Sequence, residues 1–314
     1  MPDPTVDLTT RLADATLANP VLTAAGCAGV GRELAPFFDV AELGALVTRS
    51  IQRDARSGLS TPRVAETASG LLSAVGQQGP GVDGFLATDL PWLAQRKVRT
   101  VVSIAGTTLE EYAELARRIG NSPGVSGLEV NLLEVAADPY QLGKVVRVVR
   151  RETARGVAVL VKLTSEVASV VDGAAAAAEA GADGLVLIGG PRGLSIDPAT
   201  MRPRLGGVVG GLSGPAIKPI ALRCVWQVHA AMPGMPLVGV GGVRTGADAL
   251  EFLLAGATAV QVGSAILHDP SAPLRVRDEL GDLLAARGFD RAADAVGYAH
   301  RKPDEEPHEE LVQR

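Results

Sequence analysis

Eight short apolar segments recur along this sequence, and stretches with helical patterning separate them. They cover residues 20–26, 45–50, 100–106, 127–131, 158–164, 184–190, 236–243 and 259–265. Strands that are apolar along their whole length are typical of parallel sheets, because helices cover both faces of such a sheet. Eight strand–helix units predict an α/β fold of the (β/α)8, or TIM barrel, type, and an open doubly wound sheet is the alternative.

The helical patterns lie between these segments. We expect helices over 33–40, 82–94, 109–119, 168–180, 217–232, 247–255 and 272–287, and one more that begins at Asp138 with Pro139 in its first turn. Thr107 is the expected cap of the helix over 109–119. Residues 51–82 and 191–215 are too long for ordinary strand–helix connections, and long loops of this kind are often functional.

The length, composition and net charge indicate which classes of protein the sequence fits. The chain has 314 residues, and 46% of them are hydrophobic, which suffices for one large core. We expect a single barrel over residues 1–300 and a polar, disordered tail over 301–314. The net charge of −5 argues against nucleic acid or an anionic membrane as the partner. We see no targeting segment at the start of the chain and therefore expect a cytoplasmic protein.

The cysteines and histidines do not indicate a metal site. Cys27 and Cys224 are too few for a disulfide framework or an internal iron–sulfur cluster. His229 and His268 lack the spacing of metal ligands, and no metal is expected.

One glycine-rich loop and two buried strands follow each other late in the chain. The loop spans residues 206–214, and the strands are the segments 236–243 and 259–265, each of which ends in glycine and small residues. Glycine allows backbone N–H groups to approach an anion closely. At the ends of successive parallel strands this arrangement predicts a phosphate site.

Several motifs in order resemble class 1 dihydroorotate dehydrogenases, specifically the type that works with an iron–sulfur subunit in some bacteria. The resemblance rests on residues 211–219 (GLSGPAIKP), 239–243 (GVGGV), 263–265 (GSA), 161–163 (VKL), 61–67 (TPRVAET) and 79–85 (GPGVDGF). It runs from about Asn19 to about Leu284, and it implies an FMN-dependent barrel that forms a homodimer.

The resemblance also implies where FMN would bind. Lys162 is expected beside the flavin ring, where a cation would stabilise the anionic reduced flavin. The residues implied to hold the phosphate are Gly214, Gly241, Gly242, Gly263 and Ser264, and those implied to lie along the flavin are Ala25, Gly26, Thr48, Arg49, Ser103, Asn131, Ile188 and Gly189.

The sequence departs from the family pattern after the fourth strand. In the resembling enzymes a lid loop there carries a cysteine that takes a proton from the substrate. Here the chain reads Asn131-Leu-Leu-Glu-Val, and the resemblance aligns Glu134 with that cysteine. A carboxylate can act as a base. Cys27 is a second candidate acid or base, and the alternatives are a solvated loop carboxylate at 134 and a small buried turn residue at 27.

Most of the implied substrate contacts also differ from the family pattern, and only Asn131 is kept. They fall on Arg49, Ser73, Asn131, Gly190 and Arg192. Arg49 stands where the family has lysine, Ser73 where it has asparagine, and Gly189 and Gly190 where it has asparagine and a hydroxyl residue. A site built to hydrogen-bond its substrate loses much affinity when those partners are absent.

These observations favour an FMN oxidoreductase that acts on a substrate other than dihydroorotate, and secondary metabolism is the setting we expect for it. Its reaction would be hydride transfer between flavin N5 and a C–C or C=C bond next to a carbonyl. A genuine dihydroorotate dehydrogenase with a replaced base is the first alternative. The second is a flavin-binding subunit without turnover of its own. An iron–sulfur electron-transfer subunit is a further expected partner.

Overall fold

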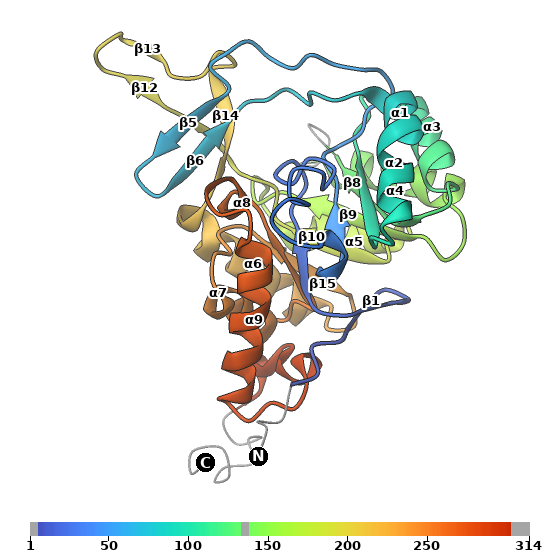
Figure 1. Cartoon of the computed structure of the whole chain (residues 1–314), viewed down its shortest axis with the longest axis vertical. Helices are drawn as coiled ribbons and strands as arrows, with labels where there is room; N and C mark the ends of the chain where they lie inside the picture. Colours follow the sequence, from blue (N-terminus) through green and yellow to red (C-terminus); the bar gives the residue numbers. More distant parts are fainter. Residues whose placement is uncertain (1–5, 133–137, 303–314) are drawn as a thin grey trace.

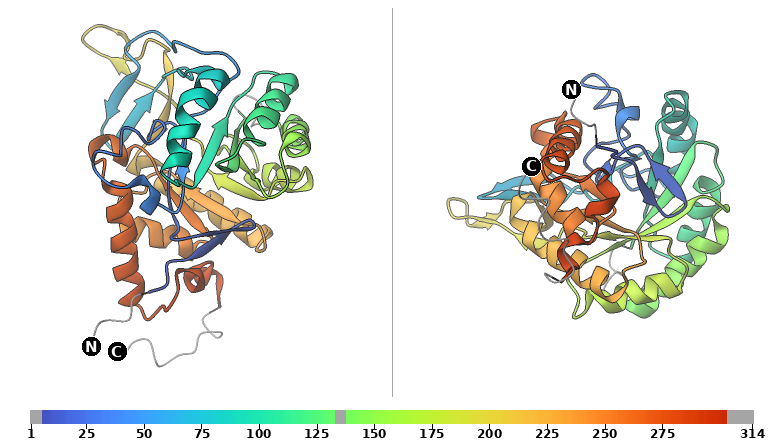
Figure 2. Two further views of the ribbon diagram at one scale, coloured as in Figure 1. Left: turned by 45° about the vertical axis from the view of Figure 1, so that its right-hand side comes forward. Right: turned by 90° about the horizontal axis from the view of Figure 1, so that it is seen from below.

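A computed structural model describes residues 6–132 and 138–302 of the chain. Its centre is an eight-stranded sheet in which the strands follow the order β3-β16-β15-β10-β9-β8-β7-β4. All seven pairings are parallel. A parallel bridge between Leu22 and Ala45 joins the two ends of the sheet, so the strands form the ring seen from below in Figure 2. The predicted barrel is confirmed, and the open sheet is excluded.

The strands of the barrel are β3 (Val21–Thr23), β4 (Leu46–Val47), β7 (Thr100–Ile104), β8 (Val125–Asn131), β9 (Ala158–Leu163), β10 (Gly184–Leu187), β15 (Leu237–Val240) and β16 (Ala259–Val262).

Helices surround this ring (Figure 1). The long ones are α3 (Leu109–Ile119), α4 (Pro139–Glu152), α5 (Val170–Glu179), α6 (Lys218–Ala231), α7 (Gly246–Leu254) and α9 (Ala272–Ala285). Shorter turns of helix are α1 (Gly81–Gly84), η2 (Phe85–Asp89), α2 (Leu90–Gln95) and α8 (Ala265–His268). Within the described ranges no helix is long and apolar enough to span a bilayer.

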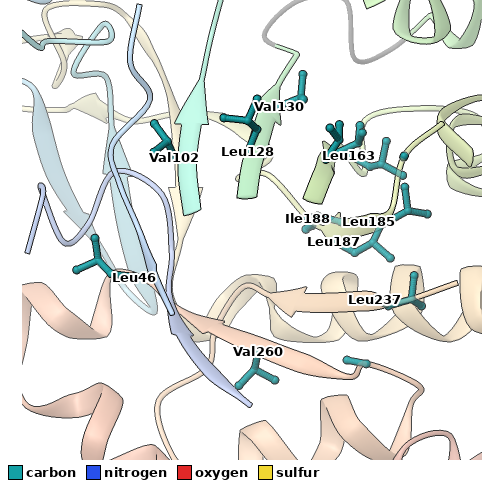
Figure 3. Close-up of a cluster of buried hydrophobic side chains, with 14 of the residues drawn as sticks. Leu46, Val102, Leu128, Val130, Leu163, Leu185, Leu187, Ile188, Leu237 and Val260 are labelled. Carbon is teal, nitrogen blue, oxygen red and sulfur yellow. The ribbon is translucent and has the colours of Figure 1, made fainter. Parts of the chain in front are cut away.

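Two apolar clusters hold the barrel together because side chains alternate between the faces of each strand. On β8, Leu128 and Val130 point outward and pack in the layer between strands and helices, part of which is drawn in Figure 3. Inside the ring a second cluster includes Val101, Leu160 and Val186. The hairpin of β1 (Thr10–Leu12) and β2 (Ala15–Leu17) adds Leu12 and Leu17 to that interior cluster, so it covers the end of the barrel opposite the cavity described below.

The two long insertions pair with each other. β5 (Val64–Thr67) and β6 (Gly70–Ser73) come from the first insertion, and β11 (Arg192–Leu194) and β14 (Val209–Ser213) from the second. They form one antiparallel sheet in the order β11-β14-β6-β5, and β12 (Ile196–Asp197) pairs with β13 (Arg202–Pro203) in a projecting hairpin (Figure 1). This sheet was not predicted, since its strands are short and its two halves come from insertions more than 100 residues apart.

Two local predictions are wrong. Residues 33–37 form turns and residue 38 a bend, and only a short 3-10 turn, η1 (Val40–Glu42), follows them. Pro36 explains this, because it has no N–H to donate within a helix. The cap of α3 is Thr108, whose Oγ1 accepts from the backbone N–H of Glu111 at 3.2 Å, while Thr107 instead donates to the Glu111 carboxylate.

Replacing Phe252 with alanine should destabilise the barrel strongly. The side chain is 0% exposed on α7 and lies so close to β15 that a Cβ at Gly239 would be 2.4 Å from its Cδ1. Loss of a fully buried aromatic ring costs about 3–5 kcal/mol of unfolding free energy, which urea unfolding would measure. Phe37→Ala is the matched control, because Phe37 is 60% exposed. Equal losses in both variants would contradict this packing.

Candidate active site

A cavity of about 1300 Å³ opens at the carboxyl ends of the barrel strands. Residues of the four-stranded insertion sheet, among them Glu66, Leu71 and Ser73, line its outer side. Active sites of (β/α)8 barrels lie at this end, where the strand–helix loops converge. The predicted site residues that line the cavity are Ala25, Gly26, Cys27, Arg49, Ser73, Asn131, Lys162, Ile188, Gly189, Gly190, Arg192, Gly214, Gly241, Gly242, Gly263 and Ser264.

Two predicted residues are placed differently. Thr48 and Ser103 are 0% exposed and do not line the cavity. They lie beneath it in a polar chain: the Thr48 hydroxyl accepts from the Ser103 N–H at 3.3 Å, and the Ser103 hydroxyl is 2.9 Å from that of Ser50. Asn131 donates to Ser50 at 3.0 Å, so this series of hydrogen bonds holds the Asn131 amide in place at the cavity wall. Glu134 lies outside the described residues.

Glycines form a cradle on one side of the cavity. Gly214, Gly241 and Gly242 have φ angles of 98°, 125° and 78°, which disfavour any residue with a side chain. A Cβ at Gly242 would lie 3.0 Å from the carbonyl oxygen of Gly214, so the two loops touch. Among the described residues, no acceptor is found for the backbone N–H groups of Gly242, Gly263 or Ser264. Such free donors, grouped around one space, suit an anion.

Lys162 lies beside this cradle in a buried polar triad. Its Nζ donates to Gln261 Oε1 at 2.9 Å and lies 3.2 Å from Glu129 Oε1. Gln261 Nε2 in turn donates to Glu129 Oε2 at 2.6 Å. Glu129 Oε1 nevertheless has no hydrogen bond. The Lys162–Glu129 contact is therefore an ion pair held by charge, with the lysine hydrogen bond directed at Gln261.

Cys27 lines the cavity as a neutral thiol. Burial raises its pKa to about 11, and the nearby Lys162 charge lowers it by less. At pH 7 roughly one thiol in ten thousand would then be ionised. This pKa argues against Cys27 as the base at neutral pH.

The opposite side of the cavity carries the residues expected to contact substrate. Arg49 Nη1 donates to the Gln78 carbonyl at 3.3 Å. The backbone N–H of Arg192 donates to Glu166 Oε1 at 3.1 Å. Gly190 has a structural reason to be glycine, because a Cβ there would lie 2.7 Å from the Leu212 carbonyl oxygen on β14.

Four polar residues at the cavity or just beneath it were not predicted from the sequence: Glu129, Gln261, Ser50 and Glu166. Glu129 could have been found: it lies two residues before Asn131 on a predicted strand, so both side chains point into the barrel. Gln261 could not, since β16 and β8 are separated by three other strands in the sheet and meet only across the barrel interior.

Comparisons with known proteins agree on one family. The family model described as dihydroorotate dehydrogenase matches residues 7–284. Proteins similar to the chain include catalytic subunits of dihydroorotate dehydrogenase B (NAD(+)). The one from Pelobacter propionicus is 44% identical over 93% of this chain and 98% of its own length. Those from Desulforudis audaxviator and Anoxybacillus flavithermus are 45% and 42% identical, each over 92% of this chain and over 96% and 95% of their own lengths.

Alkylation of Cys27 should be slow at neutral pH. In a Cys224→Ser variant, Cys27 is the remaining cysteine, and only a thiolate reacts with iodoacetamide. A pKa of about 11 instead of 9.0 lowers the rate at pH 7 about a hundredfold. The rate should climb as the pH rises toward 11. The same variant in denaturant is the control, and a folded-state rate that levels off below pH 9 would contradict the neutral thiol.

Proposed function

Because the chain belongs to the dihydroorotate dehydrogenase family, whose members are flavin-dependent CH–CH oxidoreductases, we propose that it binds FMN in this cavity and oxidises dihydroorotate to orotate. This is the hypothesis that the sequence analysis held as an alternative. The shared name of relatives that are 42–45% identical over more than 90% of the chain favours it over a different substrate.

The observation that best supports the proposal is that the glycine cradle and Lys162 line the same cavity. Backbone N–H groups at Gly242, Gly263 and Ser264 are without acceptors in the described structure and suit a phosphate dianion. Lys162 is 13% exposed and lines the same cavity, so its charge can act on the ring of the cofactor. The cradle, the cation and the cavity together fit a flat, phosphorylated cofactor such as FMN.

The reaction requires a hydride acceptor and a base, and the protein residues supply the base. Oxidation of dihydroorotate removes a hydride from one ring carbon and a proton from its neighbour, and a C=C bond forms between them. Bound FMN supplies the acceptor for the hydride. The proton needs a base, and the thiol of Cys27 is a poor one at neutral pH. Glu134 stays the predicted base, since a carboxylate is ionised at that pH.

A different substrate is the second candidate function, and the residues on the substrate side favour it. Arg49, Ser73, Gly189 and Arg192 line the cavity where the family resemblance leads us to expect lysine and amide side chains. Arg49 donates to a backbone carbonyl oxygen and Arg192 is exposed, so either guanidinium could bind an acidic group of a substrate. A role in secondary metabolism belongs to this candidate.

The expected assembly follows the relatives. Their name, catalytic subunit of an NAD(+) enzyme, supports an additional electron-transfer subunit, of the iron–sulfur type, that carries electrons from this chain to NAD(+). A homodimer in the cytoplasm is the expected form. A flavin-binding subunit without turnover is the remaining alternative.

A carboxylate placed in the cradle should weaken FMN binding. Gly263 has room for a side chain, because a Cβ there would contact the nearest atom at 3.4 Å. Gly263→Asp should therefore fold, yet its charge would repel the phosphate, and we expect at least a tenfold rise in the FMN Kd by fluorescence titration. Gly234→Asp is the matched control, since no atom lies within 4 Å of a Cβ at that position. Equal Kd values for the two variants would contradict the cradle.

Turnover of dihydroorotate separates the two candidate functions. The FMN-loaded protein should reduce an artificial acceptor when dihydroorotate is added, and Glu134→Gln should lower kcat at least a hundredfold if it is the base. Cys27→Ser should leave kcat within about threefold, because a neutral thiol takes up no proton. A protein that binds FMN and shows no dihydroorotate turnover would favour another substrate or the subunit without turnover.

A further inference from the structure

Glu129 is an ionisable group buried inside the barrel. Its side chain is 0% exposed. Gly127, two residues earlier on β8, faces the same side of the strand and lies next to Val101 of the apolar interior cluster. A carboxylate at such a position is costly unless a charge and hydrogen bonds compensate it. The compensation comes from β9 and β16, which supply Lys162 and Gln261.

The triad has a directed geometry. Gln261 accepts from Lys162 Nζ at 2.9 Å and donates to Glu129 Oε2 at 2.6 Å, so its amide cannot rotate without breaking one of these bonds. Lys162 therefore has two anchors, the Gln261 amide and the Glu129 charge. Glu129 and Lys162 line the cavity, and Gln261 does not. The cation is held at the floor of the cavity, with its counter-charge 3.2 Å away.

We infer that Glu129 is a positioning residue that fixes Lys162 through Gln261 and limits how strongly the lysine charge acts on the bound flavin. The inference rests on the proposed binding of FMN in this cavity. Lys162 alone would favour the more negative, reduced form of the cofactor. Glu129 neutralises part of that charge, so the reduction potential of the cofactor depends on the pair and not on the lysine alone.

Glu129→Gln tests this inference, because it removes the negative charge and keeps the shape of the side chain. We expect the affinity for reduced FMN, relative to oxidised FMN, to rise at least tenfold, which is about 30 mV for a two-electron couple. Dye-equilibrated reduction of the FMN-loaded protein measures the potential. Glu114→Gln is the matched control: Glu114 pairs with Arg118 on the outer helix α3, and this variant should not change the potential. A potential that is unchanged or lower in Glu129→Gln would overturn the inference.

A double-mutant cycle separates positioning from a general charge effect. Lys162→Gln should lower the relative affinity for reduced FMN. In that background Glu129→Gln should change it less than threefold, because the lysine whose position and charge Glu129 controls is no longer there. The same shift in both backgrounds would show that Glu129 acts independently of Lys162, and would also overturn the inference. If Glu129→Gln does not fold, Glu129→Asp takes its place, with a smaller shift in the same direction.

The cycle can also be measured without FMN, which keeps this inference distinct from the proposed function. In the cofactor-free protein, Glu129→Gln should lower the Tm, and the loss should shrink when Lys162 is already glutamine. A protein that binds no FMN but shows this coupling would refute the proposed function and leave the triad intact. Equal Tm losses in both backgrounds would refute the triad itself.

Discussion

Eight parallel strands need apolar cover on both faces and a partner at both edges, and the rest of this structure follows from that requirement. Ring closure between Leu22 and Ala45 removes the edges. Helices cover the outer face, and side chains such as Val101, Leu160 and Val186 fill the interior. Because all strands run the same way, their carboxyl ends meet at one end of the barrel. Residues from distant parts of the chain are thereby brought to one cavity.

The same closure places charge inside an apolar barrel. Glu129, Lys162 and Gln261 come from three strands, two of which, β8 and β16, are not neighbours in the sheet. Their side chains meet across the interior just below the cavity. The carboxylate, the ammonium group and the amide compensate one another through two hydrogen bonds and one ion pair. Buried charges are stable only when they are compensated in this way. The barrel thus presents a cation to the cavity from a rigid floor.

Periodicity and turn chemistry predicted the ring of strands and the long helices, since those signals are local. The positions of Gly242 and Gly263 at the cavity could be predicted because each follows an apolar strand. The pairing of β6 with β14 could not be predicted, because nothing local in residues 70–73 specifies a partner 140 residues away. The sequence around Thr48 and Ser103 does not indicate whether these side chains line the cavity or lie in the layer beneath it. We expected a different substrate partly because Gly190 lacks a side chain that could contact dihydroorotate. The close approach of β14, however, also requires glycine at this position.

The absorption spectrum of the purified protein decides whether this cavity binds FMN. After incubation with FMN and removal of the excess, the protein should show the flavin absorption bands. Denaturation should then release about one FMN per chain, while the Gly263→Asp variant, treated identically, should retain little. A spectrum without flavin bands, and no FMN released on denaturation, would contradict the account.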